Sequence, residues 1–352
     1  MLTELTIENF KGIQTCKIED LGRINLFIGK NDSGKSTILE AMYYFFQELR
    51  APPTLQQIMS RRADVSVSGR ELWFKYRQES PISFSVTFSS LKLVLTVTFE
   101  KRTGYFTSVF TQESVSNGMG TGRRVLRGTT YRGTDFAMTN SYGAMTENLH
   151  ADDNLKAALL DYSTGMELID CTLKSKTTVI EDILSVLKIT SEDEKFGEVL
   201  NDIYGKGKEW EFMPTLANDR EKRLAIKEGN QLTYFSDFGD GLRCCVGILG
   251  TAISSVNTAL FIEEIESHQH YGSLSKLLSH LVKIARENKL QVFLTTHSID
   301  IWNSLSRGVY VDDQKREKEE FRCFLMERDM ETGKVTIEQT DDYQKITKAL
   351  GN

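Results

Sequence analysis

The chain has 352 residues, of which 40% are apolar and 26% charged, and its formal net charge is −6. This composition indicates one large globular domain or two, and the acidic balance does not point to a general nucleic-acid binder, although it leaves room for a local basic patch. No apolar run is long enough to cross a bilayer, the N-terminus lacks a signal-peptide core, and the five cysteines include no C-x-x-C pair, so we expect a cytoplasmic protein without membrane contact, disulfide framework or zinc site.

The first fifty residues contain a phosphate-binding loop between a strand and a helix. Residues 2–9 and 23–29 have the apolar pattern of strands, and residues 29–36, GKNDSGKS, match G-x-x-x-x-G-K-[ST]. Apolar residues then recur every three or four positions, which predicts a helix that Pro52 and Pro53 end. Strand, loop and helix in this order suit a nucleotide, because backbone N–H groups and the helix N-terminus can surround its phosphates.

Two residues of this loop carry most of the expected chemistry. We expect Lys35 to reach the β- and γ-phosphates and the hydroxyl of Ser36 to bind Mg²⁺. The other candidate nucleotide-binding residues of this segment are Gly29, Asn31, Asp32, Ser33, Gly34 and Thr37.

The middle of the chain is predicted to contain an antiparallel sheet, a loop and several helices. Residues 81–110 alternate apolar and polar residues, as in a hairpin or meander. Residues 114–148 are rich in Gly, Ser, Thr and Asn and are expected to form a long, mobile loop. Residues 151–204 contain two or three helical patterns but no sustained heptads, so no long coiled-coil arm is expected.

The most basic stretch of the chain, residues 120–133, lies in the predicted loop. It contains Arg123, Arg124, Arg127 and Arg132. Clustered arginines on a loop would suit DNA phosphates and would contact them regardless of base sequence. An ordinary solvated loop accounts for the same charges and is the commoner outcome, so DNA binding stays open.

Two adjacent carboxylates follow a short apolar strand predicted at residues 260–262. Glu263 and Glu264 stand at its C-terminal end, where open α/β sheets bind ligands. We expect Glu263 to hold Mg²⁺, usually through a water, and Glu264 to polarise the attacking water. A solvated acidic turn would show the same pattern, but the phosphate loop in the same chain favours the catalytic interpretation.

A histidine follows the next apolar strand, at residues 290–294. His297 stands at the C-terminal end of that strand, which is expected to lie beside the strand of the two carboxylates. Its imidazole could donate a hydrogen bond to the γ-phosphate or to the attacking water. A lone histidine more often has a structural role, which is the alternative here.

A glycine-flanked helix start forms the fourth candidate. Gly239 and Gly241 precede a helix of small and apolar residues, and Ser236 or Asp240 could cap it. Such an N-terminus can bind an anion. Taken alone, the segment is better explained as an ordinary turn before a buried helix.

These four motifs in this order resemble the ABC-type ATPase heads of the SMC, RecF and OLD-like group. The resemblance rests on the segments IENFKGI, FIGKNDSGKSTILEAM, SDFGDGL, LFIEEIESHQHYGSL and QVFLTTHSIDIW. It is closest to compact prokaryotic OLD-like AAA ATPases, which are found beside nucleases in phage-defence systems. It covers about residues 1–50 and 230–310.

The resemblance implies a composite site for ATP and Mg²⁺ between two subunits. The residues that would act on the nucleotide of their own subunit are Lys35, Ser36, Glu263, Glu264 and His297. Ser236 and Gly239 would instead face the γ-phosphate held by the other subunit. Lys11 occupies a position where relatives often carry a basic residue near the phosphates. Specificity for adenine likewise rests on the resemblance.

Three features depart from the family pattern. Glu263 stands where relatives usually carry Asp, and its extra methylene moves the carboxylate outward. SDFGDG replaces a strict Ser-Gly-Gly signature. The glutamine that normally completes the metal site is not identified, and Gln78 is only one candidate for it.

The expected fold is an α/β P-loop NTPase of the ABC-ATPase type. It is a two-lobed head with a mixed central sheet, an antiparallel sheet and a small helical insertion. Residues 1–150 would form the first ATPase lobe and residues 151–204 the helical insertion, which would contact a partner or a second copy. Residues 205–352 would form the second lobe, ending in a hairpin at 321–339.

The expected function is that of an Mg²⁺-dependent ATPase whose nucleotide-dependent assembly, at least a homodimer, controls a DNA-directed or effector activity in anti-phage defence. Larger OLD-like proteins carry a TOPRIM nuclease domain, and the residues after His297 are too few for one. We therefore expect a nuclease or toxin effector to be a separate protein. Two alternatives stay open: a low-turnover, ATP-gated scaffold and a DNA-repair ATPase similar to RecF.

Overall fold

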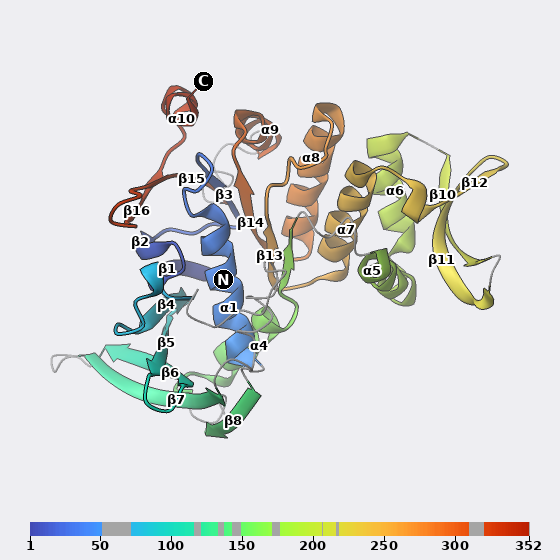
Figure 1. Ribbon diagram of the computed structural model, residues 1–352. Coiled ribbons are helices and arrows are strands. Elements are labelled where there is room, and N and C mark those ends of the chain that lie inside the picture. The colour runs from blue at the N-terminus through green and yellow to red at the C-terminus, as the bar shows by residue number, and fades with distance from the viewer. Residues whose placement is uncertain are drawn as a thin grey trace.

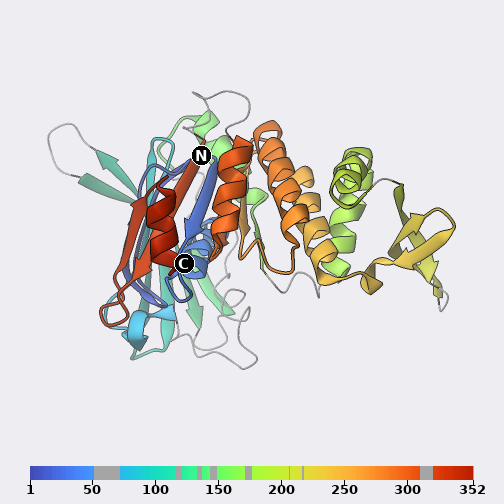
Figure 2. The same ribbon diagram turned by 90° about the horizontal axis from the view of Figure 1, so that it is seen from above.

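The computed structural model describes most of the chain in nine segments. These are residues 1–50, 72–115, 121–132, 137–142, 149–170, 177–205, 207–215, 218–309 and 320–351. A head with two sheets carries a lateral part of helices and a small third sheet, so the molecule is elongated (Figures 1 and 2). Among the described residues, no helix combines the length and apolar character that a membrane span requires.

The central sheet is mixed, as the motifs predict. Its order is β16–β15–β3–β14–β13–β9, with β16 antiparallel at one edge and the other neighbours parallel. The strands are β3 (Ile24–Ile28), β9 (Glu167–Ile169), β13 (Ala259–Ile262), β14 (Gln291–Thr296), β15 (Phe321–Arg328) and β16 (Val335–Gln339). Because β3, β14 and β13 are parallel neighbours, the phosphate loop, the two carboxylates and the histidine all follow strand ends at one edge of the sheet.

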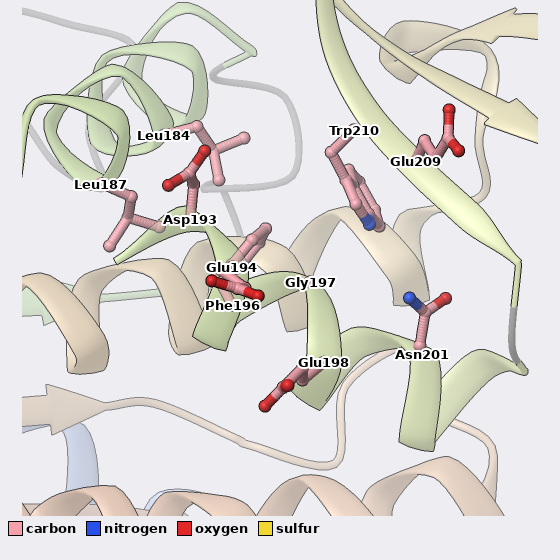
Figure 3. A pocket seen from close by; sticks show the side chains of 10 residues that line it. All are labelled: Leu184, Leu187, Asp193, Glu194, Phe196, Gly197, Glu198, Asn201, Glu209 and Trp210. Carbon is pink, nitrogen blue, oxygen red and sulfur yellow. The ribbon is translucent and has the colours of Figure 1, made fainter. Parts of the chain in front are cut away.

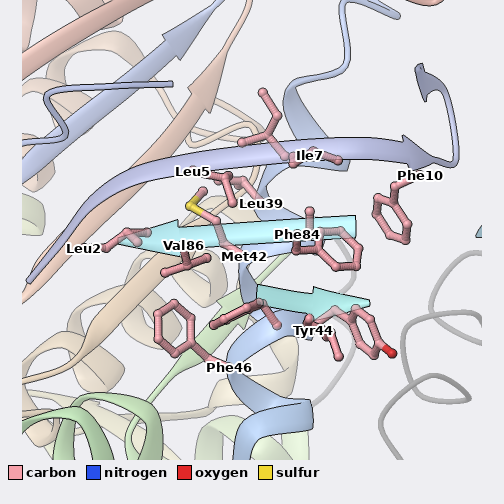
Figure 4. Close-up of a cluster of buried hydrophobic side chains, with 14 of the residues drawn as sticks. Leu2, Leu5, Ile7, Phe10, Leu39, Met42, Tyr44, Phe46, Phe84 and Val86 are labelled. Carbon is pink, nitrogen blue, oxygen red and sulfur yellow. The ribbon is translucent and has the colours of Figure 1, made fainter. Parts of the chain in front are cut away.

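The central sheet separates two hydrophobic cores, because side chains alternate along each strand. In β3, Leu26 and Ile28 pack in one core and Phe27 in the other, where Phe27 stacks on Phe324 at 5.4 Å between ring centroids. The core of Phe27 also contains α1 (Lys35–Arg50) and the antiparallel sheet (Figure 4). The other core contains most of the remaining helices. These helices are α5 (Thr177–Ile189), α6 (Asp193–Tyr204), α7 (Asp240–Ser254), α8 (Tyr271–Glu287), α9 (Ile299–Val309) and α10 (Tyr343–Leu350).

The antiparallel sheet is larger than predicted. Its order is β2–β1–β4–β5–β6–β7–β8. The strands are β1 (Leu2–Phe10), β2 (Ile13–Ile18), β4 (Ile82–Phe88), β5 (Leu91–Glu100), β6 (Tyr105–Val115), β7 (Thr121–Arg132) and β8 (Ala137–Tyr142). The meander predicted at 81–110 is confirmed by β4, β5 and β6, whereas β2 was not predicted.

The long loop predicted at residues 114–148 is wrong over two stretches, because β7 and β8 form there. Strand β7 pairs with β6 along its whole length and with β8 on its other side. Leu126 and Thr129 of β7 are buried, although most residues of this strand are polar or glycine. The apolar pattern of this stretch does not predict a strand. Pairing with β6 stabilises it as one. The other parts of the predicted loop, 116–120, 133–136 and 143–148, lie outside the described residues.

The lateral part comprises α5, α6 and a small sheet of β10 (Lys208–Thr215), β11 (Asn218–Glu228) and β12 (Gln231–Tyr234) (Figures 1 and 2). The other elements between residues 151 and 204 belong to the head. There α4 (Asp153–Thr164) contacts α1, and β9 is an edge strand of the central sheet. Only part of the stretch predicted as a helical insertion is therefore lateral. The proposed boundaries 1–150, 151–204 and 205–352 remain predictions.

The hairpin predicted at residues 321–339 is confirmed by the antiparallel pair β15 and β16. Its turn requires a glycine, since Gly333 has φ +73° and a Cβ there would lie 2.2 Å from the Phe74 ring. The Gly333 N–H donates to the carbonyl of Asp329 at 2.7 Å. Helix α10 (Tyr343–Leu350) follows, and two short 3₁₀ turns, η2 (Phe74–Tyr76) and η5 (Phe235–Asp237), complete the described elements.

Candidate nucleotide-binding site

The phosphate loop encloses its own lysine. Lys35 is the first residue of α1 and is only 6% exposed. Its Nζ donates to the carbonyl oxygens of Gly29 and Lys30, both at 2.7 Å, and lies 3.5 Å from Ser33 Oγ. The ammonium therefore points into the loop, where phosphate oxygens would lie in a P-loop protein.

Backbone conformation shapes the same loop. Gly34 has φ +95° and Asp32 has φ +63°, so the chain turns through the left-handed region twice before α1 begins. Gly29 has no room for a side chain, because a Cβ there would lie 2.5 Å from the carbonyl oxygen of Met326. Asn31 and Asp32 are exposed on the loop, whereas Ser36 and Thr37 are half-buried in the first turn of α1.

The two carboxylates leave β13 with different backbone partners. The Glu263 N–H donates to the carbonyl of Ile169 in β9 at 2.8 Å. The Glu264 N–H donates to Thr295 Oγ1 in β14 at 2.9 Å. Glu264 has φ +47°, so the strand ends there and the chain turns. Two adjacent residues can in this way approach one ligand, although strand alternation would point them to opposite faces.

Electrostatic interactions link the lysine to these acids. Burial lowers the pKa of the Lys35 ammonium below its usual range. The carboxylates whose charges oppose this shift in pKa are, in decreasing order, Glu264, Glu266, Asp32 and Glu263. The fold thus brings together the phosphate-loop lysine and the predicted pair of carboxylates, with a third acid after β13.

That third acid, Glu266, was missed by the sequence-based prediction. Its Oε1 accepts hydrogen bonds from Thr296 Oγ1 at 2.7 Å and from the His297 N–H at 3.0 Å, and it lies 3.1 Å from His297 Nδ1. Its other oxygen, Oε2, is buried and has no hydrogen-bond partner among the described residues. In the sequence, the only sign of this role is that the run EEIESH contains a further acid two residues after the predicted pair.

His297 stands at the end of β14, as predicted, and its side chain is 49% exposed. Because Nδ1 faces the Glu266 carboxylate, Nδ1 carries the proton and Nε2 is directed away from that contact. A neutral ring in this state accepts at Nε2, and a protonated ring donates there.

The other candidates near the loop have partners of their own. Lys11 Nζ forms a 2.7 Å ion pair with Glu40 of α1, which is only 2% exposed. Gln78 is 8% exposed, and its side-chain nitrogen has no hydrogen-bond partner in the described part of the chain. No contact of the described residues joins Gln78 to Ser36, so the structure does not identify it as a metal ligand.

The donors around the loop fit an Mg²⁺ ion that is held jointly with a nucleotide. Within the described ranges, no three His, Cys, Asp or Glu side chains are grouped so that they could hold a metal alone. Mg²⁺ in nucleotide sites takes few protein ligands and completes its shell with phosphate oxygens and water. One hydroxyl and one carboxylate, those of Ser36 and Glu263, are a donor set of this kind.

The signature segment lies elsewhere. Ser236 is in η5, and Gly239 is the N-cap of α7. The buried residues of α7 belong to the core on the opposite face of the central sheet from α1. No hydrogen bond or ion pair among the described residues joins Ser236 or Gly239 to residues 29–37. The structure therefore does not bring these two candidates to the phosphate loop of their own chain.

The start of α7 instead packs on the loop after β13. Gly241 is needed there, because a Cβ would lie 2.4 Å from the carbonyl oxygen of His268. Gln269 Nε2 also donates to the Gly241 carbonyl at 2.6 Å. His270, another residue of this loop, caps α8 by accepting the Gly272 N–H at 3.2 Å.

The basic stretch at residues 120–133 is not a loop, since most of it is β7. Arg127 is 9% exposed, and its Nη2 donates to the carbonyl of Glu48 at the end of α1. Its guanidinium also lies 5.6 Å from the Phe110 ring centroid. Burial lowers the pKa of Arg127. Arg127 therefore joins β7 to α1 and is not available to DNA, whereas Arg124 is exposed.

Comparison with known proteins places these features in a family. A model described as the AAA ATPase domain matches residues 1–210. A second AAA domain model, whose description names the AbiEii toxin of type IV toxin–antitoxin systems, matches residues 176–301. An ATP/GTP phosphatase of Helicobacter pylori is 20% identical over 335 residues, which are 89% of this chain and 90% of that protein. An uncharacterized protein of Methanocaldococcus jannaschii is 49% identical over 45 residues, 13% of this chain and 20% of that protein.

Solved structures confirm the predicted fold. An Smc head bound to the C-winged helix domain of ScpA aligns with a TM-score of 0.52 over 98% of this chain and 99% of that chain, at 12% identity. Such an identity shows a common fold and no more. The architecture is that of an α/β P-loop ATPase similar to SMC heads. Since the first family model spans more than half of the residues, the chain belongs to the AAA ATPase domain family.

Proposed function

We propose that the protein binds ATP with Mg²⁺ and hydrolyses it at the edge where β3, β13 and β14 end. The observation that carries this proposal is the position of Lys35, whose ammonium lies inside the phosphate loop and interacts with the carboxylates after β13. A phosphate chain in the loop would replace the two carbonyl oxygens as acceptors for this ammonium. The family model and the ATP/GTP phosphatase relative support nucleotide hydrolysis.

The proposed roles follow from where the side chains lie. Mg²⁺, when bound, would neutralise charge on the β- and γ-phosphate oxygens, with Ser36 and Glu263 as its protein ligands. Glu264 would accept a hydrogen bond from the attacking water and then take its proton. As the water oxygen bonds to the γ-phosphorus, the bond from phosphorus to the bridging oxygen breaks, and ADP leaves.

His297 would donate to the γ-phosphate through Nε2. Since Nδ1 faces Glu266 at 3.1 Å, a hydrogen bond donated from Nε2 requires a ring that carries a proton on both nitrogens. Glu266 is in this scheme a positioning residue. Lys11 would reach a phosphate only after leaving its ion pair with Glu40. Backbone N–H groups of the loop, from Gly29 to Thr37, would provide the remaining phosphate contacts.

We propose further that ATP joins two copies of the chain. Ser236 and Gly239 lie away from the phosphate loop of their own chain, which supports a contact with the nucleotide of a second copy. No backbone strain or packing requires a glycine at Gly239, where φ is −63° and an added Cβ would meet nothing within 4 Å. A glycine at such a position is useful when another molecule approaches the backbone closely.

The ATP-bound dimer would control a separate effector, such as a nuclease or toxin, in the manner of OLD-like systems of anti-phage defence. The second family model supports this, since its description names a toxin. A role in DNA repair similar to that of RecF is the second candidate. It has less support, because Arg127 of the basic stretch is buried and paired. A third candidate, the ATP-gated scaffold, would hydrolyse ATP more slowly than either of these.

Phosphate release and solution mass test these proposals together. Wild type, Glu264→Gln and the exposed control Glu8→Gln would be compared with ATP and Mg²⁺. We expect Glu264→Gln to reduce the rate on the order of 100-fold or more, since general-base catalysis contributes that much, and Glu8→Gln to leave it unchanged. A rate in wild type that stays at the level of Glu264→Gln would favour the scaffold.

Light scattering of Glu264→Gln then tests assembly, because this variant should bind ATP without consuming it. ATP with Mg²⁺ is expected to raise the mass from monomer to dimer. An equal mass with and without ATP would contradict nucleotide-dependent dimerisation, whatever the rate of hydrolysis.

A further inference from the structure

A pocket of about 350 Å³ opens on the lateral part, between α5, α6 and β10 (Figure 3). Its inner wall is apolar and comes from three elements: Leu184 and Leu187 of α5, Phe196 of α6 and Trp210 of β10. The rings of Phe196 and Trp210 meet edge to face, with centroids 5.8 Å apart. A pocket of this volume with aromatic walls is large enough for a side chain or a small ligand.

The rim of the pocket is acidic. Asp193, Glu194 and Glu198 of α6 line it, all three are exposed, and none has an ion-pair partner in the part of the chain that the structure describes. Glu209 of β10 also lines the pocket and is 3.6 Å from Lys227, but both side chains are about half exposed, so this pair is weak. The occupant that complements such a rim carries positive charge.

One further feature indicates that something approaches this surface closely. Gly197 lies in the interior of α6 and lines the pocket, and a Cβ there would meet nothing within 4 Å. A glycine inside a helix is unfavourable, and neither packing nor φ explains this one. The indole N–H of Trp210 is buried and has no acceptor among the described residues. Because this N–H is closed to solvent, Trp210 offers an occupant its ring and not a hydrogen bond.

Exposed apolar side chains of α5 indicate that a protein contacts the lateral part, although they lie on another side of this helix than Leu184 and Leu187. On the lateral part, α5 exposes Val179, Val186 and Ile189, the last of them 82% exposed. Large apolar residues gathered on one exposed helix are typical of protein contacts. An arginine suits the pocket better than a lysine, because its planar guanidinium can stack on Trp210 while it pairs with carboxylates.

We propose that this pocket binds an arginine of a partner protein, with the guanidinium between the aromatic wall and the acidic rim. The proposal names a docking point for a partner of the ATPase but does not depend on hydrolysis, since none of the residues that line the pocket belongs to the candidate nucleotide site. Its failure would leave the nucleotide site untouched, and loss of ATPase activity would not remove the pocket.

The test uses a fluorescein-labelled peptide of alternating arginine and glycine with blocked termini, and the same peptide with lysine in place of arginine. Anisotropy with the full chain at low salt should show saturable binding of the arginine peptide and weaker binding of the lysine peptide. Glu194→Gln/Glu198→Gln should weaken binding about tenfold through the loss of charge-assisted contacts. This change removes like charges four residues apart, so it should not weaken α6.

Gly197→Leu should fill the pocket and abolish binding. Glu8→Gln/Glu19→Gln, with the same change of charge in β1 and directly after β2, should leave binding unchanged. Circular dichroism checks that each variant is folded. Equal affinity in wild type and Glu194→Gln/Glu198→Gln, equal affinity of the two peptides, or absence of saturable binding would overturn the proposal. A dimer without ATP that Gly197→Leu dissociates would also overturn it, because the occupant would then be a second copy of the chain.

Discussion

Glu266 and His297 form a pair in which one carboxylate oxygen contacts the histidine twice. Oε1 of Glu266 accepts the backbone N–H of His297 at 3.0 Å and lies 3.1 Å from its Nδ1. The first contact holds the chain at the end of β14, and the second sets the ring orientation and the position of its proton. A histidine held in this way can present Nε2 to the nucleotide in a constant direction.

Removal of the Glu266 charge should therefore reduce hydrolysis more than nucleotide binding. We expect Glu266→Gln to lower kcat on the order of 10- to 100-fold, the usual cost of losing a residue that orients a functional histidine. The affinity for ATP should stay within about threefold of wild type. Steady-state phosphate release and nucleotide titration measure the two quantities. Equal kcat in wild type and Glu266→Gln would contradict the positioning role.

The contacts of Glu266 could not be predicted from the sequence, whereas the positions of the motif residues could. Motif spacing was sufficient to place Lys35, Glu264 and His297 at one edge of the sheet, because the ends of neighbouring parallel strands meet there. The role of Glu266 depends on the turn after β13, where Glu264 has φ +47°. A run of acids gives no sign of that turn.

Strands β7 and β9 are among those missed, for a related reason. Strand β7 has few apolar residues and gains its stability from pairing with β6, which a local pattern cannot reveal. Strand β9 has only 3 residues, too few for any periodicity, and is defined by its parallel pairing with β13. The arginines of β7 were consequently assigned to a loop, either solvated or in contact with DNA, although Arg127 is buried against α1.

Arg127 should therefore contribute to stability. We expect Arg127→Ala to lower the free energy of unfolding by about 1–3 kcal/mol, because it leaves the buried Glu48 carbonyl without this donor. Arg124→Ala, on an exposed position of the same strand, should change it by less than about 0.5 kcal/mol. Urea unfolding measures both. Equal stability of the two variants, together with weaker DNA binding of Arg127→Ala, would instead favour a role of Arg127 in DNA contact.

The pKa of Lys35 predicts how nucleotide affinity depends on pH. Burial is the largest cause and lowers this pKa, so Lys35 loses its proton at a lower pH than an exposed lysine does. Only the ammonium form attracts phosphate. The contribution of Lys35 to nucleotide affinity should thus fall as pH rises through the lowered pKa, and binding in that range should take up a proton.

The same shift has a defined effect on stability. Because the folded state disfavours the charged form of Lys35, this residue opposes folding below its folded pKa, and the penalty disappears as pH rises above the unfolded value. Titration of a fluorescent nucleotide at several pH values, in wild type and in Lys35→Arg, checks the effect on binding. The decline at alkaline pH should be absent in Lys35→Arg, since arginine stays charged. Parallel declines in both proteins would assign the effect to another group.

Gly241 and Gly239, at the start of α7, allow packing within one chain to be distinguished from contact with a second chain. Gly241→Ala places a Cβ 2.4 Å from the carbonyl of His268, so it should destabilise the fold itself. At Gly239 φ is −63° and a Cβ meets nothing within 4 Å, so Gly239→Ala should change stability by less than about 1 kcal/mol. Thermal unfolding of the two variants measures this difference.

If a second copy approaches Gly239 in the ATP-bound dimer, the added methyl group will obstruct it. In the Glu264→Gln background, Gly239→Ala should then reduce the fraction of dimer that ATP induces, while a fluorescent nucleotide still binds the monomer with unchanged affinity. Light scattering and nucleotide titration give the two results. A stable Gly239→Ala variant that dimerises normally would show that the composite site does not use this glycine. Loss of nucleotide binding by the monomer would instead place Gly239 near the phosphate loop of its own chain, contrary to the separation of α7 and α1 on opposite faces of the central sheet.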